Sequence, residues 1–222
     1  MKYYNMPKRL LTAFILTICT FAASAAPITV DFTGVLTSSF GTLTSGDSFS
    51  GSYTFDPSVS ARAGSTPSFA VFDNLLDASL TIGTFSATVG PGAGLPEIQQ
   101  DNVAGADRYA LGAGNPVGSS QIGGLDISSF GFRLDDTSGT AITDALALLS
   151  SPSLSSFTSN TFLIFFGDPT STDPNGFAVV TGALETLSVR NSTVPEPGSL
   201  LLLGAAAVSS RFARRRIKKV NS

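Results

Sequence analysis

The sequence predicts an all-β fold, an antiparallel β-sandwich of jelly-roll type, for the middle of this 222-residue chain. Short runs with an apolar residue at every second position alternate there with turns rich in Gly, Ser, Thr and Asp. Only residues 143–149 have helical spacing, with Leu146 and Leu149 on one side and Pro152 as a stop. At most one short helix or turn is therefore expected among the strands.

Period-two alternation places the expected strands. The alternating sets, in chain order, are Ile28, Val30 and Phe32; Phe49, Tyr53 and Phe55; Leu80 and Ile82; Phe85, Ala87 and Val89; Phe130, Phe132 and Leu134; Phe177 and Val179; and Leu187 and Val189. The phase changes after Ile82, so Gly83 predicts a β-bulge. The run TFLIFF, 161–166, is apolar on both faces and predicts a central strand. Residues 177–190 predict either a closing hairpin or one bent strand.

The N-terminal end, residues 1–25, is typical of a secretory signal peptide. A basic start precedes an apolar stretch, 10–23, and the small residues Ala23-Ser24-Ala25, which predict cleavage after Ala25. The alternative is a permanent membrane anchor, but the stretch is short and interrupted by threonines. The single cysteine, Cys19, lies inside this segment, so no disulfide is expected in the mature chain.

Charge separates the two ends from the middle. Between Pro27 and Val194 there are fifteen acidic residues and only four basic ones, and the other nine basic residues lie in the end segments. The positive-inside rule predicts this pattern for a chain whose ends stay cytoplasmic while the middle crosses the membrane. An acidic middle also repels phosphate, so a nucleic-acid partner is not expected.

The C-terminal end combines three unlike segments. Pro195, Glu196 and Pro197 form a stiff, extended strip, because proline fixes its own backbone angle and restricts the residue before it. An uncharged, mostly apolar run follows at 198–208, shorter than the ~20 residues that usually span a bilayer, and then a basic tail at 211–219. Taken singly, the run is also typical of a buried helix and the tail of a solvated end.

In this order, and behind a signal peptide, the segments at 194–219 resemble the PEP-CTERM sorting domain of exported bacterial proteins. The resemblance implies export across the inner membrane, transient anchoring by a short transmembrane helix, and processing by an exosortase that recognises Pro195, Glu196 and Pro197. It also implies delivery to the cell surface or extracellular space. The chain departs from the commonest pattern in its long ending after the arginines. The expected organisation is a signal peptide at 1–25, an ectodomain at 26–193 and a sorting segment at 194–222.

The residue composition of the middle segment, 27–194, excludes several kinds of catalytic site. It has no His, Cys or Lys, so Ser-His-Asp and Cys-His systems, Schiff-base lysines and thiolate or imidazole zinc sites are absent. A glycoside hydrolase needs two carboxylates about 5 to 10 Å apart across a cleft. Asp135 and Asp136 are adjacent at an expected strand end, where their side chains point to opposite faces, so we expect turn residues there.

Calcium is the one metal ion for which the middle offers candidate ligands. In the loop 167–176, Asp168, Asp173 and Asn175 could converge with main-chain carbonyls. The spacing differs from an EF-hand loop, and Asp-Pro and Asn-Gly are ordinary turn formers, so a plain turn is favoured. Asp101, Asp107 and Arg108 form a similar, weaker set.

The sequence therefore predicts an exported protein sorted to the surface through its C-terminal signal. Its ectodomain is expected to have a structural, adhesive or glycan-associated role in the extracellular matrix, with no enzymatic activity and no cofactor; the link to polysaccharide comes from the resemblance alone. Two alternatives stay open at this point. One is a carboxylate-dependent hydrolase of an extracellular glycan, and the other is a membrane-anchored protein that is never processed.

Overall fold

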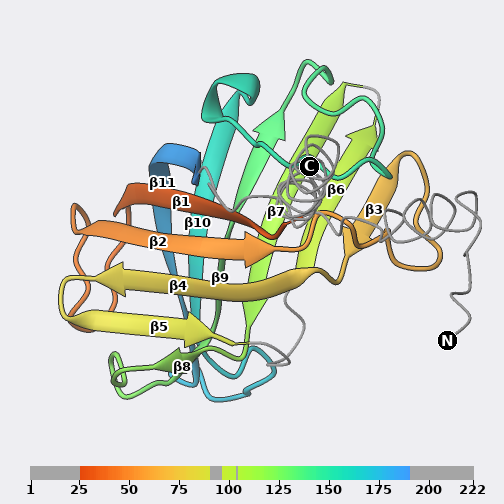
Figure 1. Ribbon diagram of the computed structural model, residues 1–222. Helices are drawn as coiled ribbons and strands as arrows, with labels where there is room; N and C mark the ends of the chain where they lie inside the picture. The colour runs from red at the N-terminus through yellow and green to blue at the C-terminus, as the bar shows by residue number, and fades with distance from the viewer. Residues whose placement is uncertain (1–25, 91–96, 104, 191–222) are drawn as a thin grey trace, which may run out of the picture. The chain divides into compact units, whose positions relative to one another are not determined.

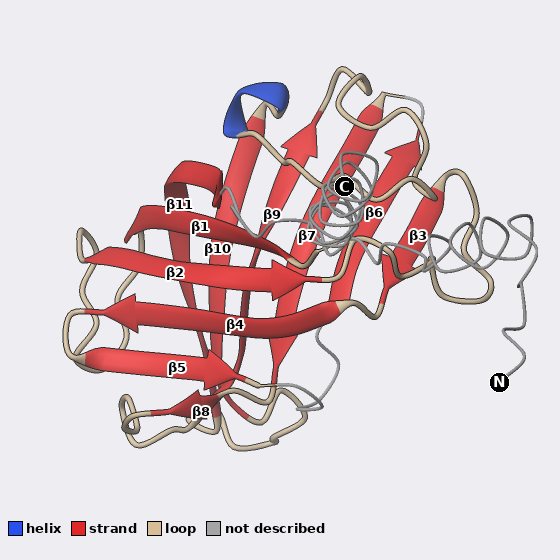
Figure 2. Ribbon diagram, in the orientation of Figure 1, coloured by secondary structure: helices blue, strands red, loops and turns tan. Residues whose placement is uncertain are grey.

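The computed structural model describes residues 26–90, 97–103 and 105–190 (Figures 1 and 2). From Pro27 onward these residues belong to one compact unit. The all-β, antiparallel prediction is confirmed, and the helical structure among them is one 3-10 turn, η1 (Leu154–Ser156). The strands are β1 (Ile28–Leu36), β2 (Ser48–Phe55), β3 (Phe69–Phe72), β4 (Leu75–Ile82), β5 (Phe85–Val89), β6 (Glu97–Val103), β7 (Ala106–Gly114), β8 (Val117–Gly118), β9 (Ile127–Asp136), β10 (Ser159–Gly167) and β11 (Phe177–Arg190).

One continuous sheet contains all eleven strands, in the order β3-β6-β7-β9-β10-β11-β1-β2-β4-β5-β8. The two separate sheets of a jelly roll are therefore not formed. Instead the sheet curls into a half-barrel, and β1, β2, β4 and β5 cross steeply in front of β10, β9 and β7 (Figure 1). This arrangement resembles an orthogonal packing, in which the apolar side chains of both halves meet between them.

The curl depends on β11, which is one bent strand and not a hairpin. Its first half pairs with β10 and its second half with β1, and Gly182 has a partner on each side, Phe162 and Leu36. A Cβ at Gly182 would lie 2.9 Å from both a Phe49 ring carbon and the Val35 carbonyl oxygen, so only glycine fits this corner. Beyond the corner, Glu185 is the extra residue of a bulge opposite Thr33 and Gly34.

Aromatic rings from both halves of the sheet fill the core. The Phe49 ring of β2 stacks on the Phe162 ring of β10 with centroids 4.1 Å apart, and Phe32 contacts Phe132 edge-on at 5.8 Å. The Tyr53 and Tyr109 hydroxyls, from β2 and β7, meet at 3.0 Å. These six side chains are almost fully buried, and their contacts join strands that are distant in the sheet. The central-strand prediction for 161–166 is confirmed by β10.

One local expectation differs from the structure, and the choice left open at 143–149, a short helix or a turn, is decided by it. Gly83 marks a two-residue hairpin turn and not a bulge, because Ile82 pairs directly with Phe85 and Gly83 has a φ of 56°. The stretch 143–149 forms a turn and not a helix. The buried Gln100 amide donates to the Ala145 and Ala147 carbonyls, both at 3.1 Å, and accepts from Leu149 N–H at 2.6 Å. Its side chain thus replaces the intrahelical hydrogen bonds that those groups would make.

The two edge strands of the sheet are β3 and the two-residue β8, which pairs with β5. Beside β3, Thr66 exchanges two main-chain hydrogen bonds with Phe69, and Arg62 N–H donates to the Val71 carbonyl. Beside β5, Ser119 bonds both main-chain groups of Ser86, at 2.7 and 2.9 Å. The main-chain partners beside β3 and the shortness of β8 limit pairing with a further strand.

The predicted signal peptide at 1–25 and the sorting segment at 194–222, with its expected transmembrane helix, lie outside the described residues. Within the described ranges, no helix has the length and apolar character needed to cross a membrane.

Candidate functional site

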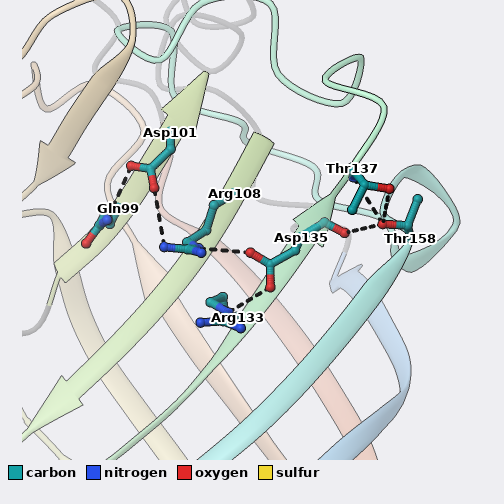
Figure 3. A network of polar contacts seen from close by, with 7 residues as sticks. All are labelled: Gln99, Asp101, Arg108, Arg133, Asp135, Thr137 and Thr158. Carbon is teal, nitrogen blue, oxygen red and sulfur yellow. Dashed lines mark hydrogen bonds and ion pairs between the residues drawn. The ribbon is translucent and has the colours of Figure 1, made fainter. Parts of the chain in front are cut away.

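A network of charged side chains lies on the outer face of β6, β7 and β9, near one end of these strands (Figure 3). The Asp135 carboxylate accepts from Arg108 Nε at 2.9 Å and from Arg133 Nε at 2.7 Å. Arg108 Nη1 lies 3.7 Å from an oxygen of Asp101, whose other oxygen accepts from Gln99 Nε2 at 3.2 Å. Asp135 therefore joins two arginines, and Arg108 joins two carboxylates.

Strand register explains why these residues meet. Asp101 is paired with Arg108, and Arg108 with Asp135, so charges of alternating sign form one row across three strands. Arg133 lies two residues before Asp135 and points to the same side. The guanidinium side chains are 39% and 46% exposed, so each ion pair contributes at most about 1 kcal/mol to stability. The main effect of the network is to fix the orientation of these side chains.

Asp136 turns to the inner face, opposite to its neighbour Asp135, as predicted from the strand alternation. It is 2% exposed. Its carboxylate accepts from the main-chain N–H groups of Thr140, Ser138 and Ala141 at 2.9, 3.0 and 3.2 Å, and from the Ser138 hydroxyl. These bonds, led by that from Thr140, hold the pKa of Asp136 well below its usual range. Asp136, the last residue of β9, therefore organises the turn after the strand, whereas Asp135, which was also predicted as a turn residue, lies within the strand.

Asp107 faces Asp136 across β7 and β9 and is also buried. One of its oxygens accepts from Ile142 N–H at 2.8 Å, and the other has no partner among the described residues. The two carboxylates together hold the loop 138–142 against the end of the sheet. Asp107 thus lies on the opposite face from Asp101 and Arg108, and the weaker calcium set does not come together.

A shallow hollow of about 480 Å³ lies at this end of the sheet and includes Asp101, Arg108, Asp135 and Asp136 in its lining. Acid–base hydrolysis requires a carboxyl pair that is free to reach a substrate. Here both oxygens of Asp135 and both of Asp136 already accept hydrogen bonds, whereas Asp107, which also lines the hollow, keeps one oxygen without a partner among the described residues. The arrangement is suited to holding strands and loops in place.

The loop between β10 and β11 contains the predicted calcium ligands. Asp168 accepts from the Thr170 hydroxyl and N–H at 2.7 and 2.8 Å, which lowers the pKa of Asp168. Asp173 accepts from Asn175 N–H at 2.9 Å. Each carboxylate closes its own turn. Across the described ranges, no three acidic, His or Cys side chains converge as a metal site would require, so the calcium prediction rests on the composition of the loop.

Sequence reasoning missed two structural polar groups. The signal for Arg133 was its place two residues before Asp135 in the same strand, because period-two alternation puts both side chains on one face. Gln100 also gave a signal, because it lies two residues after Ile98 and so on the same buried side of β6. A polar residue on the apolar side of a strand indicates a buried hydrogen-bond partner.

The comparison with known proteins concerns the C-terminal end. The chain matches the family described as PEP-CTERM protein-sorting motif over residues 193–217, which include Pro195, Glu196 and Pro197. No curated protein and no solved structure matches the chain. The matched residues lie outside the described ranges, and the motif implies export, cell-surface sorting and processing by an exosortase. The chain therefore carries at its C-terminal end the PEP-CTERM protein-sorting motif that its sequence predicts.

Proposed function

We propose that this protein is a non-enzymatic component of the cell surface or extracellular matrix, where its β-domain has a structural, adhesive or glycan-associated role. The sorting motif at 193–217 carries the proposal, because it implies export and sorting to the cell surface. On this proposal the signal peptide is removed after Ala25. A short transmembrane helix holds the chain in the inner membrane until an exosortase acts at Pro195-Glu196-Pro197.

The described body supports a non-catalytic role. The polar cluster at one end of β6, β7 and β9 consists of carboxylates that accept hydrogen bonds from arginines or from a loop. The edge strands of the body are short, four residues in β3 and two in β8, which limits edge-to-edge pairing outside the cell. A curled sheet with a continuous aromatic core provides large, rigid outer faces, and surface proteins use such faces for contact.

Mass spectrometry of the mature protein from its native host tests the sorting route. We expect a C-terminus upstream of Ser222 in the wild-type chain, and an intact Ser222 end in the double variant Pro195→Ala, Pro197→Ala. Pro169→Ala in the exposed β10–β11 loop is the matched control and should be processed normally. An intact end in the wild-type protein would refute processing and support the permanently anchored alternative.

The hydrolase alternative has its own test. Wild-type protein and the variant Asp135→Asn should both leave host polysaccharide unchanged in a reducing-end assay. Chain cleavage by the wild-type protein that disappears in Asp135→Asn, with an unchanged melting temperature, would replace the proposal with an enzymatic function.

A further inference from the structure

The outer face of β11, β1, β2, β4 and β5 consists largely of Ser and Thr side chains. Strand register lines them up across the sheet in rows. One row contains Thr186, Thr33, Ser50, Thr81 and Ser86, each directly paired with the next. All five lie on the outer side of their strands, opposite the buried apolar residues. Every position of this row is thus a small hydroxyl side chain.

The neighbouring row on the same side of the sheet also consists almost entirely of small hydroxyl side chains. It contains Ser188, Asp31, Ser52, Ser79 and Thr88, again paired directly from strand to strand. We call these two rows the hydroxyl face. Neighbouring strands in a sheet lie about 4.8 Å apart, so the hydroxyl face presents hydroxyl groups at a regular short spacing over five strands.

Hydrogen bonds between strands fix several of these hydroxyls. Thr33 Oγ1 and Thr186 Oγ1 are 2.7 Å apart, and Ser52 Oγ and Ser79 Oγ are 3.0 Å apart. A hydroxyl can donate once and accept twice, so each member of a pair keeps capacity for a ligand. Short side chains that are already oriented lose little conformational entropy on binding, whereas Lys or Arg would lose far more.

The two rows of the hydroxyl face carry little charge, and the next row on the same side of the sheet contains Arg190 and Asp77. The one charged member of the hydroxyl face, Asp31, is paired with Arg190, whose Nε donates to it at 3.0 Å. The body has fifteen acidic and four basic residues between Pro27 and Val194, so most of its negative charge lies elsewhere. The opposite outer face carries the charged network of Asp101, Arg108 and Asp135 instead. A polyanion would be repelled by the body as a whole, and a cationic partner has little charge to bind on the hydroxyl face.

We propose that the hydroxyl face binds the chains of a neutral polysaccharide. Such a chain presents rows of hydroxyls that donate and accept hydrogen bonds, which match the capacity that the face leaves open. Its binding needs no charge, and the small side chains let the polymer approach the sheet closely. This inference rests on the proposed function at the cell surface and names the class of partner that the ectodomain would contact there.

Binding of the mature protein, isolated from its host, to microcrystalline cellulose as a neutral probe tests the proposal. The double variant Ser50→Ala, Thr81→Val removes two hydroxyls that face each other in one row but keeps the strand shape. Ser129→Ala, Thr161→Val makes the same two changes on the outer side of β9 and β10 and is the matched control. Because each net hydrogen bond contributes roughly 1 kcal/mol, we expect roughly a tenfold or greater loss of affinity in the first variant and none in the control.

Three results would overturn the inference. The first is equal cellulose binding by the hydroxyl-face variant and the control variant, and the second is binding of the wild-type protein to the polyanion alginate but not to cellulose. The third is concentration-dependent self-association of the protein that is lost only in the hydroxyl-face variant. The last would make a second copy the partner. Processing is measured on the same samples by mass spectrometry. Normal processing with unchanged cellulose binding refutes the polysaccharide inference alone, whereas an unprocessed wild-type C-terminus refutes the proposed function.

Discussion

The hydrogen bond between Tyr53 and Tyr109 gives the sharpest test of how the two halves of the sheet hold together. The hydroxyls are 3.0 Å apart and both side chains are 0% exposed. Burial raises the pKa of both tyrosines, so both hydroxyls stay protonated over the working pH range. Within the described part of the chain, each hydroxyl bonds only to the other.

Removing one hydroxyl leaves its partner buried without a hydrogen bond, which costs about 1–3 kcal/mol. Tyr53→Phe and Tyr109→Phe should each lower stability by that amount, and in a domain of this size each kcal/mol lowers the melting temperature by about 2–4 °C. The double variant leaves no orphan group, so its stability should return toward wild type. The coupling energy is the double loss minus the sum of the two single losses, so we expect a magnitude of about 2 kcal/mol or more.

Urea unfolding followed by circular dichroism measures all four proteins of this cycle. Thr33→Val and Thr186→Val form the control cycle, because this hydroxyl pair is exposed and water replaces a lost partner. Its coupling should be close to zero. A double tyrosine variant that loses the sum of the two single losses would refute the reasoning, since the hydroxyls would then act independently.

Four further predictions concern the turns and packing. Hydrogen bonds lower the pKa of Asp136 in the folded state, so its contribution to stability is complete above its unfolded pKa of about 3.9 and is lost as pH falls through the lower folded value. The melting temperature measured from pH 7 to pH 2 should therefore fall less steeply for Asp136→Asn than for the wild-type protein. Identical pH profiles of the two proteins would contradict this. Gly51→Ala should lower stability by about 1–3 kcal/mol in urea unfolding, because the added methyl meets the Ser79 carbonyl and the Phe32 ring, whereas Gly90→Ala, with open space around it, should not. Gln100→Leu should increase amide hydrogen exchange at 145–149, since three main-chain groups lose their partner; unchanged exchange would refute the anchoring role. Calcium at millimolar concentration should leave the melting temperature unchanged, and an increase that Asp168→Asn abolishes would establish a calcium site.

The sequence was sufficient for the local features of this protein. Alternation at period two is a property of each strand alone, so it identified β1, β2, β4, β5 and β9 and their buried sides, while the apolar run identified β10. No alternating set marked β3, β6, β7 or β8. The opposite orientations of Asp135 and Asp136 follow from the same alternation. The C-terminal sorting motif was also predicted, because its three segments are contiguous and act through composition and order.

Tertiary structure alone decided how the strands join. The single curled sheet depends on β11 changing partners at Gly182, and nothing in a strand's own pattern specifies which neighbour it takes. The charged network and the hydroxyl face have the same origin: register brings Arg108 to Asp135 and Ser50 to Thr81 from positions far apart in the chain. Side-chain period is local, whereas pairing between strands depends on the packing of the whole core, and therefore only the folded structure shows which polar groups share a surface.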